Sequence, residues 1–180
     1  MKLILVRHGE TEENKHGIHQ GQLPGRLSDD GKVQAKKVGE RLKSVHIDII
    51  YSSDLQRCID TTQEIAKHHP TAKIIHDKRL RERSLGEFEG KKKGEADWSK
   101  LSGDELTNRP KGGEAFTDLF SRVKEFVDEL LKKKIDQTIL ISTHGGPLKM
   151  IHGILTGKNL RESFDIENQK NTSVSEYLVD

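Results

Sequence analysis

Short apolar runs alternate with longer amphipathic segments along this chain, and no other feature constrains its fold as strongly. The runs occupy residues 3–6, 47–51, 73–75 and 138–141, and polar or turn-forming residues bound each of them. Runs of this length indicate buried strands, whereas the segments between them have the periodicity of helices. Strands and helices in alternation build a parallel sheet with helices on both faces. The sequence therefore predicts an α/β fold, a three-layer α/β/α sandwich with a mostly parallel central sheet.

Four helices are expected from the spacing of apolar residues and from residues that favour helix starts and ends. Their predicted extents are from near Ser28 to Val45, from Ser52 or Ser53 to Ile65, from about Glu114 to Lys134, and from Pro147 to Gly157. The tail from Ser173 to Val179 is a candidate edge strand, because it follows the last predicted helix and has the composition of a strand.

The stretch between Gly86 and Gly113 does not fit this alternation. It contains six lysines or arginines, four glycines and few periodic apolar residues. Because it is too long for an ordinary connection, we expect it to be an excursion that faces substrate. No internal repeat or linker divides the chain, so residues 1–180 are expected to form a single domain.

The charge balance and the single cysteine limit the partners of this chain. Its formal net charge is only +2, so bulk charge does not indicate a polyanion ligand, and we expect no nucleic-acid partner. Cys58 alone cannot form an intramolecular disulfide, and the first apolar run is too short for a signal peptide or a membrane span. The sequence therefore favours a cytoplasmic protein with no membrane partner.

Two predicted strands end in a histidine followed by glycine. His8 follows the run at residues 3–6, and His144 with Gly145 follows the run at residues 138–141. Ligands of open α/β sheets bind beyond the carboxyl ends of the strands, so both histidines are expected at one site. The second pair also precedes a helix, whose unpaired backbone N–H groups attract anions. This arrangement favours a phosphate site over two unrelated polar turns.

Two arginines fit the same phosphate site. Arg7 directly follows a buried strand, and its planar guanidinium suits bidentate binding of phosphate. Arg57 lies in the first turn of a predicted helix, where a cation opposes the helix dipole, and a bound dianion would resolve this conflict. The alternative for Arg57 is an ordinary solvated side chain.

A phosphoryl-transfer site also needs a proton donor for the leaving oxygen. Glu82, Glu87 and Glu89 are the candidates, and composition does not choose among them. Because a nearby cation keeps a carboxyl group ionised, a general acid at Glu82 requires that its neighbours Arg81 and Arg83 point elsewhere.

Other phosphatase chemistries lack their characteristic residues. Glu64 stands six positions after Cys58, where a cysteine phosphatase needs an arginine, and no Asp-x-Asp motif follows a strand. The chain has no Gly-x-x-x-x-Gly-Lys-Ser/Thr loop for a nucleoside triphosphate and no His-Glu-x-x-His metal motif. These comparisons leave histidine as the favoured nucleophile.

The segment Leu-Val-Arg-His-Gly-Glu-Thr at residues 5–11 resembles the signature of the histidine phosphatase superfamily, in its phosphoglycerate mutase-like branch. Further blocks similar to those of the family follow in the family's order at residues 52–61, 80–90, 142–146 and 171–174. The resemblance covers most of the chain, and it implies the phosphoglycerate mutase-like form of the α/β sandwich.

The resemblance also implies a role for each site residue. His8 would be the nucleophile that becomes phosphohistidine, and Glu82 the acid that protonates the leaving group and then deprotonates water. Arg7, Arg57 and His144 would hold the equatorial phosphate oxygens. The implied substrate-binding residues are Arg7, Asn14, Gln20, Arg57, His144 and Gly145. No metal or cofactor is required.

The expected function is hydrolysis of phosphate monoesters of small metabolites. A phosphoglycerate mutase is the first alternative, although Arg109 with Pro110 is the only echo of the arginine-rich insertion that mutases use. A non-enzymatic phosphate-binding or interaction module is the second. Pro24 and Arg26 replace the aspartate and proline usual in relatives, which could turn Arg26 toward substrate. A homodimer through an edge strand is left open.

Overall fold

The computed structural model describes residues 1–134 and 136–179. Its strands are β1 (Lys2–Arg7), β2 (Ile49–Ser52), β3 (Lys73–His76), β4 (Thr138–Thr143) and β5 (Val174–Leu178). Its helices are α1 (Glu12–Lys15), α2 (Asp29–Leu42), α3 (Gln56–Ala66), α4 (Phe116–Lys132), α5 (Gly145–Leu155) and α6 (Leu160–Phe164). Three single 3₁₀ turns lie at Lys78–Leu80, Gly86–Phe88 and Trp98–Lys100.

The five strands form one sheet in the order β3-β2-β4-β1-β5. The first four strands of this order are parallel, and β5 pairs antiparallel with β1 at one edge. In this register Arg7 lies beside Thr143 and Ser52 beside Ser142, so β1, β2 and β4 end at the same side of the sheet. The mostly parallel sheet and the edge strand near the C-terminus confirm the sequence prediction.

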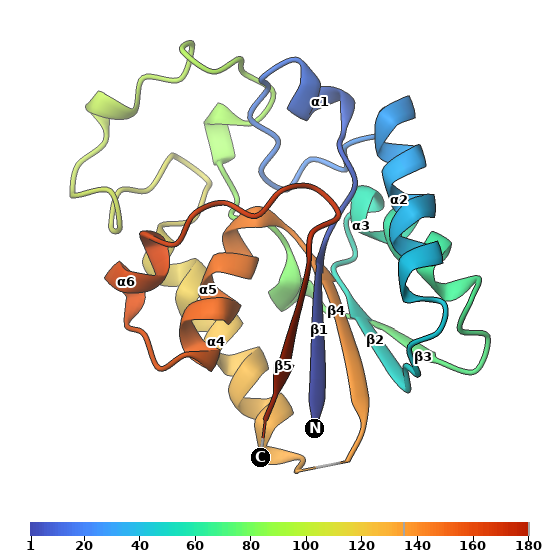
Figure 1. Ribbon diagram of the computed structural model, residues 1–180. Coiled ribbons are helices and arrows are strands. Elements are labelled where there is room, and N and C mark those ends of the chain that lie inside the picture. Colours follow the sequence, from blue (N-terminus) through green and yellow to red (C-terminus); the bar gives the residue numbers. More distant parts are fainter. Residues whose placement is uncertain (135, 180) are drawn as a thin grey trace.

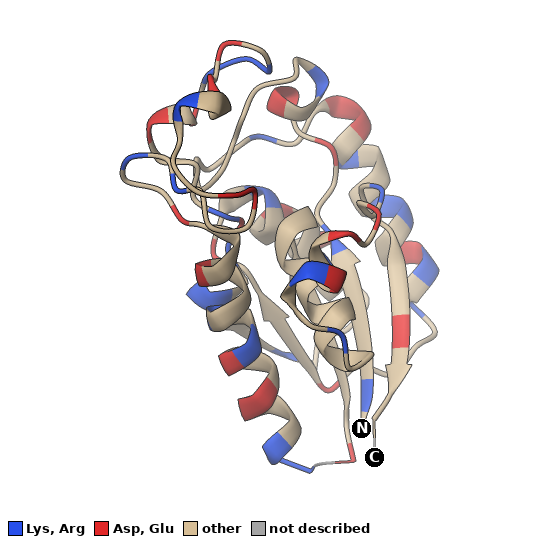
Figure 2. Cartoon of the chain, turned by 90° about the vertical axis from the view of Figure 1, so that its left-hand side faces the viewer, with Lys and Arg blue, Asp and Glu red and all other residues tan. Residues whose placement is uncertain are grey.

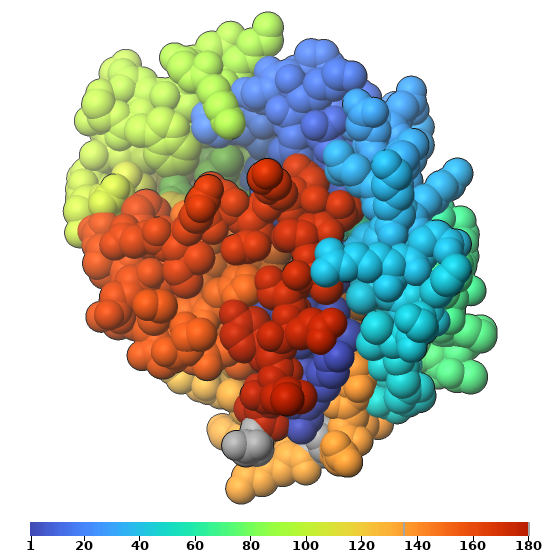
Figure 3. All heavy atoms as spheres, viewed as in Figure 1, coloured from blue at the N-terminus to red at the C-terminus, as the bar shows by residue number. Residues whose placement is uncertain are grey.

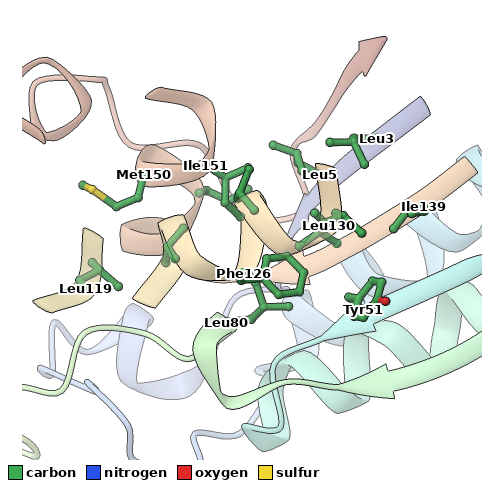
Figure 4. Close-up of a cluster of buried hydrophobic side chains, with 14 residues drawn as sticks. Leu3, Leu5, Tyr51, Leu80, Leu119, Phe126, Leu130, Ile139, Met150 and Ile151 are labelled. Carbon is green, nitrogen blue, oxygen red and sulfur yellow. The ribbon is translucent and has the colours of Figure 1, made fainter. Parts of the chain in front are cut away.

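Helices cover both faces of this sheet, as Figure 1 shows. Successive residues of a strand point to opposite faces, so Leu3 and Leu5 pack toward α4 and α5, whereas Ile4 and Val6 pack toward α2 and α3. The larger of the two clusters is drawn in Figure 4, where Phe126 of α4 lies among side chains from the sheet. The predicted three-layer α/β/α sandwich is confirmed.

The predicted helices are present, but two of their starts were wrong. Ser28 is the N-cap of α2, as expected, and its side chain accepts a hydrogen bond from the Gly31 N–H at 3.0 Å. The second helix does not begin at Ser52 or Ser53, because Ser52 ends β2 and α3 begins only at Gln56. The fourth begins at Gly145, two residues before Pro147.

The excursion between Gly86 and Gly113 contains two 3₁₀ turns and no α-helix or named strand. Its Lys92 forms an isolated bridge with Ile18, in the loop that follows α1. The excursion and the segment around α1 lie together at the end of the molecule opposite the chain termini (Figure 1).

Residues of both charge signs alternate along the backbone in Figure 2, in keeping with the small net charge. Among the helices that the structure describes, none is sufficiently long and apolar to cross a membrane.

Candidate active site

A cavity of about 800 Å³ lies beyond the carboxyl ends of β1 and β4. It is bounded by the loop after β1, the excursion, the start of α5 and the segment before β5. Figure 3 shows the first two and the last of these segments around a recess. Its lining includes these predicted site residues: Arg7, His8, Asn14, Gln20, Arg57, Glu82 and Gly145. The structure therefore brings seven of the eight predicted residues to one cavity; His144 lies behind its wall.

His8 is almost completely buried, with 3% of its surface exposed. Its Nδ1 lies 2.7 Å from the carbonyl oxygen of Gly9, which can only accept a hydrogen bond. Nδ1 therefore carries the proton, and Nε2 has the lone pair. Burial lowers the pKa of His8 well below its usual value, and the neighbouring Arg57 and Arg7 lower it further. The ring is neutral at pH 7, which is the state that a nucleophile requires.

The backbone around His8 is held by segments far away in the sequence. The Gly9 N–H donates to Thr61 Oγ1 of α3 at 3.0 Å, and the side-chain amide of Asn171 donates to the His8 carbonyl at 2.9 Å. The Thr172 N–H donates to the Arg7 carbonyl at 3.1 Å. The C-terminal segment thus fixes the end of β1.

Arg57 is 1% exposed, so the alternative of a solvated arginine is excluded. Its Nη1 donates to the carbonyl of Leu23 at 2.5 Å, and its Nη2 donates to the carbonyl of Gly21 at 2.8 Å. Its Nε donates to Nδ1 of His144 at 3.0 Å. Main-chain carbonyls therefore accept hydrogen bonds from the Arg57 guanidinium, which the sequence analysis expected a bound anion to satisfy. The side chain still lines the cavity.

Arg7 is half-buried beside His8. Its Nη1 donates to the carbonyl of Gln169, in the segment before β5. Its Nε is shielded from solvent and has no hydrogen-bond partner among the residues that the structure describes. The Arg7 side chain lines the cavity, so its positive charge lies beside any anion bound there.

His144, at 0% exposed, lies behind His8 with the two ring centroids 5.1 Å apart. Its Nδ1 accepts from Arg57, so its Nε2 carries the proton and donates to Ser53 Oγ at 2.8 Å. Burial and the charge of Arg57 lower the pKa of His144 well below its usual value. Both of its nitrogens have protein partners in this structure, and its predicted direct contact with phosphate stays a prediction.

Glu82 is the one of the three candidate acids that lines the cavity. Its Oε1 accepts from its neighbour's N–H, that of Arg83, at 2.8 Å, and its Oε2 accepts from the Gly146 N–H at the start of α5 at 3.2 Å. The group that accepts from this helix start is therefore a carboxyl group of the chain itself, where the sequence predicted phosphate. A Cβ at Gly146 would lie 2.3 Å from Glu82 Oε1, so any larger residue here would move the carboxyl group from this position.

The other two candidate acids have structural surroundings. Glu89 Oε1 accepts from the N–H groups of Gln22 and Leu85, both at 2.9 Å, and so joins two loops. Glu87 is exposed and accepts from the Lys111 N–H at 3.3 Å. Neither residue lines the cavity, and the choice that composition left open falls on Glu82.

Among the described residues, neither arginine beside Glu82 forms an ion pair with its carboxyl group. Arg81 forms an ion pair with Asp54 at 2.6 Å. The guanidinium of Arg83 lies over the rings of Phe116 and Trp98.

Arg122 of α4 holds the segment that carries Glu82. Its guanidinium donates to the carbonyls of Arg79 and Arg81, both at 2.7 Å, and of Glu82 at 2.9 Å. Its other donors bind the carboxylate of Glu114 in a bidentate pair at 2.8 and 2.9 Å. The backbone of Glu82 therefore has a fixed position relative to α4.

Asn14 and Gln20 both line the cavity, but the loop also uses their side chains. Asn14 Oδ1 accepts from the Thr11 N–H at 3.2 Å, which closes the capping box of α1. Gln20 Nε2 donates to Thr11 Oγ1, while its buried Oε1 has no hydrogen-bond partner among the described residues. Arg26 lines a different, smaller hollow between α2 and α3, so the structure does not turn it toward this cavity.

The sequence analysis missed several residues of this site. Asn171 was noted only as part of a family block, and Arg122 was not singled out at all. Lys149, Asn168 and Trp98 also line the cavity. The partial burial of Arg122 and Lys149 is not visible in periodicity. Asn171 did carry a signal, its place in a family block, but that block gave it no role.

Comparison with known proteins agrees with the geometry. The family model described as histidine phosphatase superfamily (branch 1) matches residues 3–180. The chain is 34% identical to phosphoserine phosphatase 1 of Hydrogenobacter thermophilus, over 93% of this chain and 83% of that protein. It is 34% identical to the metal-independent phosphoserine phosphatase of Arabidopsis thaliana, over 92% and 75%. The α-ribazole phosphatase from Shigella flexneri superposes with a TM-score of 0.91 at 25% identity, over 100% and 91%.

Fold, site and relatives together define an enzyme of the phosphoric monoester hydrolase class. Within that class, the chain belongs to the histidine phosphatase superfamily, branch 1.

Proposed function

We propose that this phosphatase hydrolyses phosphate monoesters of small metabolites without a metal, through a phosphohistidine intermediate on His8. The observation that carries this proposal is the state of the His8 ring. Its Nδ1 proton is committed to the Gly9 carbonyl and its pKa is lowered by burial, so Nε2 offers a lone pair beside two arginines. The name of the relative from Arabidopsis thaliana supports metal independence.

In the first step, His8 Nε2 attacks phosphorus and the bond from phosphorus to the ester oxygen breaks. Arg7 and Arg57 stabilise the charge on the non-bridging oxygens, and Glu82 gives its proton to the leaving oxygen. In the second step, Glu82 takes a proton from water, and the resulting nucleophile displaces phosphate from Nε2. The ring returns to its starting state.

The remaining predicted residues support this reaction in different ways. Asn14 and Gln20 line the cavity and add neutral hydrogen bonds to the phosphate. The N–H of Gly145, at the start of α5, binds a phosphate oxygen. His144 orients Arg57 through its Nδ1, and a direct contact with phosphate requires that its Nε2 leave Ser53.

Hydrolysis is favoured over the mutase alternative. Several relatives that are at least 30% identical are named phosphatases. Arg109, the only echo of a mutase insertion, is 56% exposed and forms an ion pair with Asp118. It does not line the cavity. A cytoplasmic location, a homodimer and the absence of nucleic-acid and membrane partners stay predictions.

The test is turnover by purified protein with a chelator present, using phosphoserine, 3-phosphoglycerate, a sugar phosphate and 4-nitrophenyl phosphate. Release of phosphate is expected, whereas 2-phosphoglycerate from 3-phosphoglycerate without phosphate release would indicate a mutase. His8→Ala is expected to abolish turnover.

Glu82→Gln separates the two steps. The nitrophenolate group leaves without a proton, so this variant forms the intermediate from 4-nitrophenyl phosphate but hydrolyses it slowly. We expect phosphohistidine to accumulate, detected as protein-bound phosphate that is absent in the His8→Ala control. Wild-type turnover in either variant would contradict the mechanism.

A further inference from the structure

Gln34 of α2 is connected to the nucleophile through one peptide group, the peptide between Gly9 and Glu10. The N–H of this peptide, which belongs to Glu10, donates to Gln34 Oε1 at 2.9 Å. Its carbonyl, which belongs to Gly9, lies 2.7 Å from Nδ1 of His8. Gln34 is half-buried and does not line the cavity, so it can act on the reaction only through neighbouring groups.

The chemistry of these two contacts fixes the direction of both hydrogen bonds. A backbone N–H can only donate, so the amide of Gln34 presents its oxygen to Glu10. The Gly9 carbonyl can only accept, so the proton between it and His8 belongs to Nδ1. Hydrogen bonds in such a chain polarise one another. An acceptor at the N–H of this peptide therefore makes its carbonyl a better acceptor for the His8 proton.

The start of α2 lies against the backbone of this peptide. A Cβ at Gly31 would lie 1.9 Å from the Glu10 carbonyl oxygen, and a Cβ at Gly9 would lie 2.6 Å from the Gly31 carbonyl oxygen. Larger residues at these two positions would force the backbones apart. The Ser28 N–H also donates to the Glu10 carbonyl at 3.0 Å. This close approach brings Gln34, about one turn further along α2, within reach of the Glu10 N–H.

The preceding peptide, between His8 and Gly9, is fixed by other residues. Thr61 Oγ1 accepts from its N–H at 3.0 Å, and Asn171 Nδ2 donates to its carbonyl at 2.9 Å. A change at Gln34 therefore leaves these supports of the His8 backbone in place. What it releases is the next peptide, whose carbonyl holds the Nδ1 proton.

We infer that Gln34 is a positioning residue for the nucleophile, which keeps the proton of His8 on Nδ1 and the lone pair on Nε2. This inference rests on the proposed phosphatase function and extends it to a residue outside the cavity. As Nε2 bonds to phosphorus, the ring gains positive charge and Nδ1–H becomes a stronger, charge-assisted donor. The peptide that Gln34 polarises therefore binds the ring more strongly in the transition state than at rest, which raises the rate of transfer.

The test compares two substitutions of Gln34 in the full-length enzyme. Gln34→Met keeps an unbranched side chain but removes the acceptor, and Gln34→Glu keeps an acceptor oxygen. The rate of phosphohistidine formation from 4-nitrophenyl phosphate in a single turnover is expected to fall roughly tenfold in Gln34→Met, the effect of about one hydrogen bond. Gln34→Glu is expected to react at least as fast as the wild type. Gln63→Met, on the exposed side of α3, is the matched control and is expected to leave the rate unchanged.

A second measurement reports the position of the proton directly. In enzyme with ¹⁵N-labelled histidine, the shifts of the ring nitrogens show which of them is protonated, and the His8 signals are those lost in His8→Ala. The proton is expected on Nδ1 alone in the wild type and in Gln34→Glu, and on both nitrogens in exchange in Gln34→Met. A residue that only docks α2 onto the loop would change the free energy of unfolding and leave these signals unmoved.

The inference is overturned if folded Gln34→Met forms phosphohistidine at the wild-type rate, or if its His8 proton stays on Nδ1 alone. It is also overturned if Gln34→Glu is as slow as Gln34→Met, since the acceptor oxygen then has no effect. If Gln34→Met does not fold, Gln34→Glu decides alone. Its stronger acceptor is expected to move the signal of the His8 Nδ1 proton downfield, and an unmoved signal overturns the inference. Failure of the proposed function gives a different result, because no phosphohistidine then forms in the wild type.

Discussion

Replacing Arg122 by methionine tests how the acid segment is held. The substitution keeps an unbranched apolar stem but removes all five hydrogen bonds that the guanidinium donates. Three main-chain carbonyls lose a charged donor, at about 1 kcal/mol each, and Glu114 loses a partner at a further ~1 kcal/mol or more. The side chains of Arg122 and Glu114 are only 17% and 21% exposed, so water replaces few of the lost hydrogen bonds. We expect the free energy of unfolding to fall by about 4 kcal/mol.

The assay is urea unfolding together with thermal unfolding. A loss of about 4 kcal/mol corresponds to a decrease in Tm of roughly 8–16 °C for a protein of this size. Arg109→Met is the matched control, because the Arg109–Asp118 pair is largely exposed and is worth less than about 1 kcal/mol. The kcat of Arg122→Met should also fall, since the carbonyl of Glu82 loses its support. A loss of stability no larger than that of Arg109→Met would refute this account.

Three further predictions follow from single contacts. Gly146→Ala should lower kcat at least tenfold in a phosphate-release assay, because its Cβ would displace the Glu82 carboxylate. The lowered pKa values of His8 and His144 mean that the unfolded state takes up protons first as the pH falls below 6.5. Stability should thus be constant above about pH 7 and fall by about 1 kcal/mol per histidine by pH 5.5 in urea titrations. Burial raises the pKa of Cys58 to about 12, so a thiol reagent at pH 8 should react only after unfolding.

The sequence was sufficient to predict the layers of the fold, because hydrophobic periodicity determines which residues must be buried. Leu3 to Val6 and Thr138 to Ile141 are apolar at every position or nearly so, which indicated strands covered on both faces, and both strands lie in the middle of the sheet. The predicted start of the second helix was wrong because two serine side chains bind the backbone without capping a helix. Ser52 and Ser53 have the residue type of helix caps. Ser52 is instead the last residue of β2, and its Oγ donates to the Ser53 carbonyl.

The site was predictable only in part, for a physical reason. His8 and His144 follow strands directly, so topology alone brings them together. Arg122 meets the carbonyls of residues 79–82, and Asn171 meets His8. These contacts join segments far apart in the sequence, and local patterns carry no information about them. That residues 1–180 form a single domain stays a prediction.

The place of β1 in the sheet has a consequence for how this protein acquires its structure. Among the described strands β1 comes first in the chain, yet the strands with which it pairs, β4 and β5, begin at Thr138 and Val174. Contacts of such long sequence separation slow folding, because the intervening chain must lose its freedom first. A growing chain therefore carries β1 without its partner strands until residues 138–143 have been made, and the contact of Asn171 with His8 can form only later still.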